Sequence, residues 1–173
     1  MPEVKIEEIY RGRVVHLVRE SFALPNGHPV QLEMVRHPGA AAIVPVDTEG
    51  NVLLIRQYRH AAGGFIYEVP AGTLQPGEAP EHCAARELIE EAGVRAGRLD
   101  LLGSIFTTPG FTDEVIHLYL ARDLEPTSQA LDADELLTVE PVPLSRAIEM
   151  CTRGELRDAK SMCALLLAER RLR

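Results

Sequence analysis

Four charged side chains fall on one turn of a helix that the sequence predicts over residues 80–92. Residues three and four positions apart share a helix face, so Glu87, Glu90 and Glu91 project together. Arg86 is the one cation on that turn, and the macrodipole disfavours negative charge near the C-terminal end of a helix. An acidic run is most often a solvated surface. Three carboxylates crowded in this way would instead suit a hard divalent cation such as Mg²⁺, which prefers oxygen ligands.

The segments on either side of these carboxylates support the helix assignment. A loop rich in glycine and proline runs from Ala71 to Gly77 and leads into the helix. Pro80 suits the first helical turn, because its missing N–H would have had no partner there. Gly93 supplies the left-handed residue that commonly ends a helix. The acidic turn is therefore expected beneath a loop with special backbone geometry.

The same segment resembles the Nudix family. Gly72, Glu78 and residues 86–94, RELIEEAGV, match the Nudix box G-x5-E-x7-R-E-U-x-E-E-x-G-U at every specified position, where U is aliphatic. So many restricted positions at fixed spacing make this motif specific. The resemblance implies an enzyme that hydrolyses a nucleoside diphosphate linked to another group, with a divalent metal ion as cofactor.

The resemblance also implies roles for individual residues. Glu87 and Glu91 correspond to metal ligands, Glu90 to a further ligand or a near neighbour, and the main-chain carbonyl of Ala71 to another ligand. Arg86 corresponds to the residue that orients the glutamates. The expected cofactor is Mg²⁺, with Mn²⁺ or Zn²⁺ as possible substitutes.

A second set of candidates lies just before the box. The segment Arg56-Gln57-Tyr58-Arg59 ends a predicted strand, and guanidinium forks match phosphate oxygens. Such arginines can also be simply solvated. The segment, followed by the EVPAG stretch from Glu68 to Gly72, resembles the subfamily that cleaves ADP-ribose. Arg59 matches that subfamily's substrate-binding arginine best, and Arg56 and Glu68 are further substrate-binding candidates.

Two other segments offer candidate substrate contacts. The turn at Thr108 resembles the subfamily's "S/T-P-G" loop, and we expect its residues Pro109, Gly110 and Phe111 at the substrate, although the sequence alone indicates only a tight turn. Arg36, before a predicted buried strand, is another possible phosphate contact.

The general base is expected on an acidic loop over residues 131–135. Glu135 is the candidate and Asp134 the alternative, while Glu90 is the rival if this loop stays open. A solvated loop remains the simpler interpretation of these charges.

Composition limits the class of protein. The 173 residues are 46% hydrophobic and 25% charged, as expected for one soluble globular domain. A net charge of −8 disfavours binding to nucleic acid or an anionic membrane. The charged N-terminus does not resemble a signal peptide, no run approaches a membrane-spanning length, and the three cysteines have no metal-binding spacing. We therefore expect reduced thiols in a cytoplasmic protein.

The hydrophobic pattern predicts an α/β fold with a mixed sheet and helices on its faces. The resemblance implies a Nudix-type α/β/α sandwich. We expect a single Nudix domain over residues 1–173, with small antiparallel strands over 1–38 and the core over 39–173. The N-terminal strands resemble those that pair or swap between subunits, which implies a homodimer. The predicted helices and strands cover residues 4–20, 30–35, 40–46, 52–58, 65–69, 101–106, 115–121, 139–142, 144–152 and 159–170.

The function expected from this resemblance is Mg²⁺-dependent hydrolysis of ADP-ribose to AMP and ribose 5-phosphate. FAD, NADH and other ADP-sugars are alternative substrates that the box does not separate. A catalytically silent Nudix domain that senses a small nucleotide is an alternative of another class.

Overall fold

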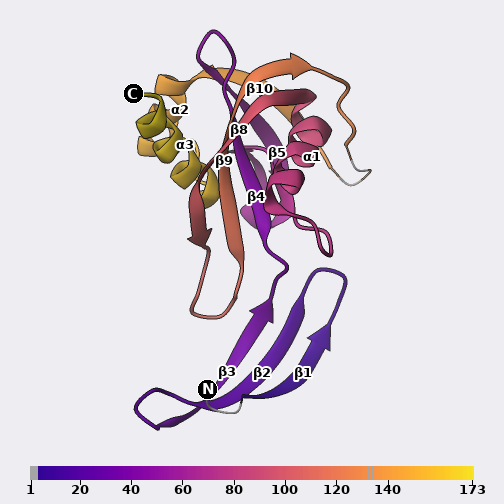
Figure 1. Ribbon diagram of the computed structural model, residues 1–173, viewed down its shortest axis with the longest axis vertical. Helices are drawn as coiled ribbons and strands as arrows, with labels where there is room; N and C mark the ends of the chain where they lie inside the picture. Colours follow the sequence, from indigo (N-terminus) through magenta and orange to yellow (C-terminus); the bar gives the residue numbers. More distant parts are fainter. Residues whose placement is uncertain (1–3, 132, 134) are drawn as a thin grey trace.

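The N-terminal strands form a separate antiparallel sheet. The computed structural model describes residues 4–131, 133 and 135–173. Its first sheet has the order β1-β2-β3 and projects from one end of the molecule (Figure 1). The strands of this sheet are β1 (Lys5–Arg11), β2 (His16–Ala23) and β3 (Pro29–Arg36). The Val35 N–H donates to the Phe111 carbonyl at 2.8 Å, so the sheet joins the rest of the chain beside that turn.

The core holds two further sheets. One is mixed, with the order β7-β4-β9-β8, in which β4 and β9 are parallel and the other neighbours antiparallel. Its strands are β4 (Ala40–Pro45), β7 (Ala71–Thr73), β8 (Val94–Phe106) and β9 (Val115–Pro126). The other is antiparallel with the order β10-β5-β6. It contains β5 (Asn51–Arg59), which a 3-10 turn η1 (His60–Ala62) follows, β6 (Gly64–Glu68) and β10 (Leu137–Pro143).

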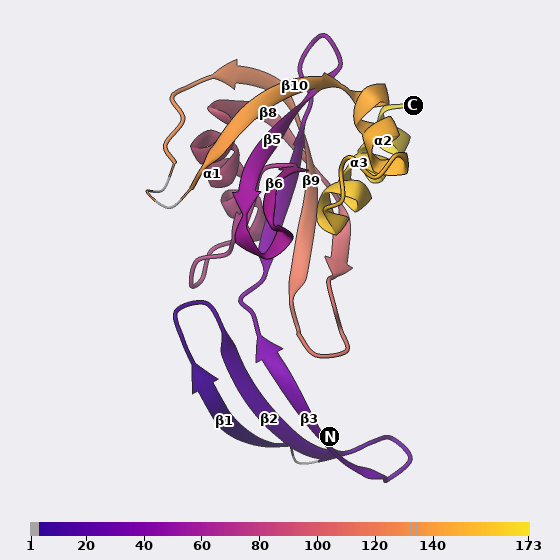
Figure 2. The same cartoon turned by 180° about the vertical axis from the view of Figure 1, so that it is seen from behind.

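Helices cover both sides of these sheets. Helix α1 (Pro80–Ala92) lies on one side, and α2 (Leu144–Thr152) and α3 (Ala159–Leu172) lie on the other (Figure 2). Strand β4 explains the layering, because successive side chains point to opposite faces. Ile43 packs in the cluster of α1 with Leu88, whereas Val44 packs in the larger cluster with Leu165 of α3.

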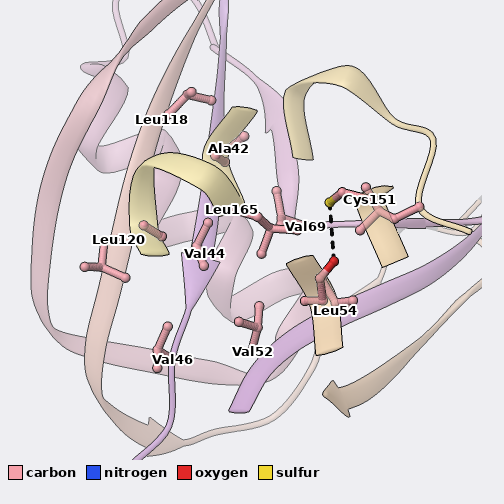
Figure 3. Close-up of a cluster of buried hydrophobic side chains, with 14 of the residues drawn as sticks. Ala42, Val44, Val46, Val52, Leu54, Val69, Leu118, Leu120, Cys151 and Leu165 are labelled. Carbon is pink, nitrogen blue, oxygen red and sulfur yellow. Dashed lines mark hydrogen bonds between the residues drawn. The ribbon is translucent and has the colours of Figure 1, made fainter. Parts of the chain in front are cut away.

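The larger cluster is the main core. It includes Leu54, Leu118, Leu120 and Leu165, all fully buried (Figure 3). Burying one such side chain stabilises a fold by about 1.5–3 kcal/mol. This cluster therefore holds the strands that carry the site against α2 and α3.

The predicted α/β class and mixed sheet are confirmed. Three strands differ from the prediction. Strand β8 begins at Val94, not Leu101, and β9 ends at Pro126, not Ala121, because the two strands pair from Val94↔Pro126 to Phe106↔Val115. Ala71–Thr73, expected as loop, is strand β7, because its backbone pairs with β4. None of the helices in the described ranges is long and apolar enough to cross a membrane.

Candidate active site

Helix α1 holds its carboxylates against the mixed sheet. The helix begins at Pro80 and ends at Gly93, whose φ of 63° is left-handed, as the sequence predicted. Leu88 packs on the sheet. Glu87 and Glu91 flank that apolar stripe, and Glu91 is only 2% exposed. The packing of α1 thus places two carboxyl groups largely out of contact with water.

Arg86 holds three carboxylates together. Its Nε donates to Glu78 Oε1 at 2.9 Å, and its Nη1 donates to Glu87 Oε1 at 2.6 Å and Glu90 Oε2 at 2.9 Å. The hydrogen bond from Arg86 lowers the pKa of Glu78 to about 2. This geometry fits the orienting role that the resemblance implied for Arg86.

Glu91 is held differently. Its Oε2 accepts a hydrogen bond from the Ala71 N–H at 2.8 Å. Burial nevertheless raises the pKa of Glu91 to about 8, and burial also raises the pKa of Glu87 above its ordinary value. Both carboxylates therefore lie where a nearby cation would favour their charged forms.

Gly72 lets strand β7 pass directly over these carboxylates. A Cβ on Gly72 would lie 1.8 Å from Glu87 Oε1 and 2.0 Å from Glu87 Cδ. A side chain at this position would displace the Glu87 carboxylate, so glycine keeps that carboxylate where it lies.

The carboxylates line a polar cavity of about 420 Å³. Its wall also includes Gln57, which is 4% exposed and whose Oε1 accepts no hydrogen bond within the described part of the chain. A buried acceptor without a donor is unfavourable, and a bound water or hydroxyl could supply one. The residues that line the cavity are Gln57, Arg59, Ala71, Gly72, Thr73, Gln75, Arg86, Glu87, Glu90, Glu91, Ala130 and Glu135.

The chemistry of this cavity fits a hard divalent cation. The implied ligands are all oxygens, namely Glu87, Glu90, Glu91 and the Ala71 carbonyl, and two of the carboxylates are buried. Within the described residues, no three acidic, histidine or cysteine side chains are grouped closely enough to hold a metal ion. The reason is that Glu87 and Glu90 turn toward Arg86 and Glu91 toward a backbone N–H. A cation would compete with these partners.

Arg59 joins this cavity to a second one of about 620 Å³. Its guanidinium forms a fork on Glu68, with Nε to Oε1 at 2.7 Å and Nη2 to Oε2 at 3.0 Å. Both oxygens of the buried Glu68 carboxylate thus accept hydrogen bonds from Arg59, so Glu68 holds the Arg59 guanidinium in place. The second cavity also includes Ile105, Phe106, Thr107, Thr108, Ile116, Lys160 and Cys163.

The other predicted substrate contacts lie elsewhere. Arg56 stacks over the Phe65 ring, 4.7 Å from its centroid. Arg36 pairs with Glu20 and Asp113. Neither arginine lines either cavity. Pro109, Gly110 and Phe111 are exposed in their turn and also lie outside both cavity linings, although the preceding Thr108 lines the second cavity.

Two of the three candidate bases line the first cavity, Glu90 and Glu135. Glu135 lies on the loop before β10, as the sequence predicted. Asp134, the alternative, lies outside the described residues.

Two of the residues at the site that were not predicted from the sequence bear on its chemistry. Gln57 lies two positions before Arg59 on β5, and the alternation of a strand places both on one face. That signal was available. Lys160, at the start of α3, donates to Glu68 Oε2 at 2.5 Å across ninety-two positions, and no local pattern indicates such a contact.

Comparison with known proteins agrees with this geometry. The family model described as NUDIX domain matches residues 35–165. The chain is 40% identical over 161 residues to an ADP-ribose pyrophosphatase of Bacillus subtilis (strain 168), covering 92% of this chain and 87% of that one. It is 39% identical over 164 residues to a methanol dehydrogenase activator of Bacillus methanolicus, covering 94% and 89%. A solved structure, "Crystal structure of ADP compounds hydrolase", superposes with a TM-score of 0.85 at 25% identity, covering 99% of this chain and 94% of the other.

The mixed sheet lies between helices, and Gly72 of β7 passes directly over the buried α1 carboxylates. These features place the chain in the class of Nudix-fold proteins. The match over residues 35–165 and the relatives near 40% identity show that this chain belongs to the Nudix family. Membership of this family, with its intact box, marks the chain as a Nudix hydrolase.

Proposed function

We propose that this protein hydrolyses the diphosphate bond of ADP-ribose, with Mg²⁺, to give AMP and ribose 5-phosphate. The observation that carries the proposal is the first cavity, which the box carboxylates, Arg59 and the candidate base Glu135 all line. The names of the relative from Bacillus subtilis and of the solved ADP compounds hydrolase support ADP-ribose as the substrate.

The metal site comprises Glu87, Glu91 and the Ala71 carbonyl, with Glu90 as a further ligand. Mn²⁺ or Zn²⁺ can replace Mg²⁺ in this proposal, because the donor set is made of oxygens that all three accept. When bound, the metal polarises phosphorus–oxygen bonds and acidifies a water molecule.

The protein's own groups supply proton transfer and charge. Glu135 accepts the proton of the attacking water, and Glu90 is the alternative base on the same wall. Arg59 has five N–H donors, of which two bind Glu68, so the others remain for phosphate oxygens. Their charge stabilises the negative charge that develops on phosphate during cleavage. Arg86 keeps the carboxylates in place.

Two rivals have specific consequences. FAD, NADH or another ADP-sugar would use the same carboxylates and differ only in the group outside the diphosphate. A catalytically silent sensor would bind ADP-ribose tightly and leave it intact. The complete carboxylate set and the candidate bases in one cavity favour catalysis.

A substrate panel tests the proposal. Purified protein with Mg²⁺ is incubated with ADP-ribose, FAD, NADH, another ADP-sugar and a GDP-sugar, and kcat/KM is measured for each. We expect the highest kcat/KM for ADP-ribose, with AMP and ribose 5-phosphate as products. A higher value for another compound would reassign the substrate, and tight binding of ADP-ribose without cleavage would support the sensor.

The proposal extends to assembly and location. The N-terminal sheet exposes apolar side chains, including Ile6, Tyr10 and Val14, and a second copy of this chain would cover them in a homodimer. The three cysteines are unpaired, which fits the reducing cytoplasm. The partner is a small nucleotide, and the net charge of −8 disfavours nucleic acid and anionic membranes.

A further inference from the structure

Four alternating charges connect Arg59 to the start of α3. Glu68 is almost fully buried at their centre and accepts the Arg59 fork described above. Lys160 Nζ donates to Glu68 Oε2 at 2.5 Å and to Asp158 Oδ2 at 3.0 Å. Burial alone would raise the pKa of Glu68, but the hydrogen bonds and charges of Arg59 and Lys160 outweigh it, so the pKa lies below its ordinary value. The carboxylate is therefore charged at neutral pH and shared by two cations.

Backbone contacts fix the far end of this network. Asp158 is the N-cap of α3, and its Oδ2 accepts from the Ser161 N–H at 3.0 Å. Ser161 Oγ in turn accepts from the Val69 N–H at 2.8 Å. Because Val69 follows Glu68 and Ser161 follows Lys160, the two segments are joined at two adjacent points. These contacts hold the backbone at Lys160 next to the strand end that carries Glu68.

The hydrogen bonds to Glu68 lower the entropy that Arg59 loses when it binds a ligand. A free arginine side chain has many rotamers, and part of that entropy is lost when the guanidinium binds a phosphate. The Glu68 fork removes that freedom beforehand. A single arginine on a buried carboxylate would have its charge largely neutralised. Arg59, Glu68 and Lys160 together carry a net charge of +1. Asp158 brings the four groups to zero, so without Lys160 the network beside Arg59 would be net negative.

We propose that Lys160 is a positioning residue for Arg59: it completes the charge compensation of Glu68, so that the fork holds and Arg59 keeps positive charge for a diphosphate. This inference rests on the proposed function, because Arg59 is there assigned to the diphosphate. Lys160 acts through Glu68 and Arg59, and it is not itself a catalytic residue.

A double-mutant cycle tests whether Lys160 acts through Arg59. Lys160→Met keeps the unbranched side chain as far as Cε and removes the charged amino group. The substitution is measured in the wild type and in Arg59→Ala. We expect Lys160→Met to raise the KM for ADP-ribose about tenfold with kcat within about twofold, because uniform binding is weakened. In the Arg59→Ala background the same change should have less than a twofold effect, since interacting residues are not additive. Equal effects in both backgrounds would overturn the proposal and indicate direct contact with the substrate or a general structural role.

Two further variants separate charge from stability. Lys160→Arg should restore KM to within about threefold, because a guanidinium can also bridge Glu68 and Asp158. Arg157→Met removes an exposed cation three positions away and should leave KM unchanged. If Arg157→Met raised KM as much as Lys160→Met, the effect would come from the overall field and the proposal would fail. The melting temperature of each variant is measured alongside the kinetics. If the higher KM of Lys160→Met disappeared at low temperature, the defect would come from lost stability, and the positioning role would be contradicted.

A substrate-independent readout distinguishes this proposal from the proposed function. The Arg59 Nε–H resonance, assigned by its disappearance in Arg59→Ala, should exchange slowly with solvent in the wild type because it binds Glu68. Exchange should accelerate at least tenfold in Lys160→Met and much less in Arg157→Met. Unchanged exchange would overturn the positioning role, whatever the substrate. Failure of the wild type to cleave ADP-ribose would instead count against the proposed function alone.

Discussion

Glu91 is the most deeply buried of the box carboxylates, and it forms no ion pair within the described part of the chain. Its pKa, raised by burial to about 8, means that at neutral pH the metal-free protein holds a proton there. A bound divalent cation must displace that proton. The residue therefore links pH, metal and stability.

The sign of this linkage gives the first prediction. Glu91 titrates near the ordinary carboxyl value of 4.5 when unfolded and near 8 when folded. The folded state binds the extra proton between these values, so the contribution of Glu91 is fully present below about 4.5 and is lost as pH rises through about 8. Without metal, wild type should lose stability relative to Glu91→Gln over this window, by at most about 1.4 kcal/mol per pH unit.

Urea unfolding in the presence of a chelator, from pH 5 to pH 9, measures this difference. Groups other than Glu91 affect both proteins alike, so only the difference between the two curves matters. Parallel curves would show that Glu91 has an ordinary pKa. Added Mg²⁺ should stabilise wild type more at pH 8 than at pH 6, because fewer protons then compete with the ion.

At the scale of elements, the site depends on strand β7 lying directly over α1. The sequence identified the helix, its Pro80 start, its Gly93 end and the box, because all of these are local signals. It treated Ala71–Thr73 as loop, since three small residues carry no periodicity and their pairing with β4 is a long-range contact. For the same reason sequence reasoning placed Arg56 and Arg59 together, whereas strand alternation sends only Arg59 and Gln57 into the cavity.

The close approach of β7 and α1 gives the second prediction. Gly72→Ala would push a methyl group into the Glu87 carboxylate, 1.8 Å from Oε1. A displacement of about 1 Å at a reacting centre can lower the rate about 100-fold. We expect a loss of that order in kcat/KM with the circular dichroism spectrum unchanged.

Gly77→Ala provides the matched control. Gly77 lies in the same loop with φ of 77° and nothing within 4 Å of an added Cβ. This variant should lose about 1–2 kcal/mol of stability from left-handed strain and keep its activity. Equal activity of the two variants would contradict the proposed closeness of Gly72 to the metal ligands.

At the scale of the molecule, the N-terminal sheet stands apart from the core (Figure 1). Val14 is 72% exposed and Tyr10 58%, which leaves much apolar surface in contact with water. Sequence reasoning predicted this antiparallel unit from alternation and the turn at residues 25–27, but it could not give its distance from the core. The predicted homodimer would bury this surface.

Sedimentation at about 10 µM tests the homodimer. Wild type should sediment as a particle of twice the 19.1 kDa chain mass. The double substitution Ile6→Glu with Tyr10→Glu should shift it toward the monomer, because two charges would have to be buried. Leu101→Glu, at a similarly exposed apolar side chain on β8, should not. A wild-type monomer, or dissociation by Leu101→Glu alone, would argue against the N-terminal interface.

The central claim is that oxygen ligands on α1 and β7 would hold a divalent cation that assists the hydrolysis of ADP-ribose by water. Phosphorus NMR of ADP-ribose incubated with the protein tests it most directly, with Mg²⁺ or with chelator, for wild type and Glu91→Gln. We expect AMP and ribose 5-phosphate from wild type with Mg²⁺ only, and at least a 100-fold slower reaction from a folded Glu91→Gln. Equal rates for the two proteins, or full wild-type activity in chelator, would contradict the account.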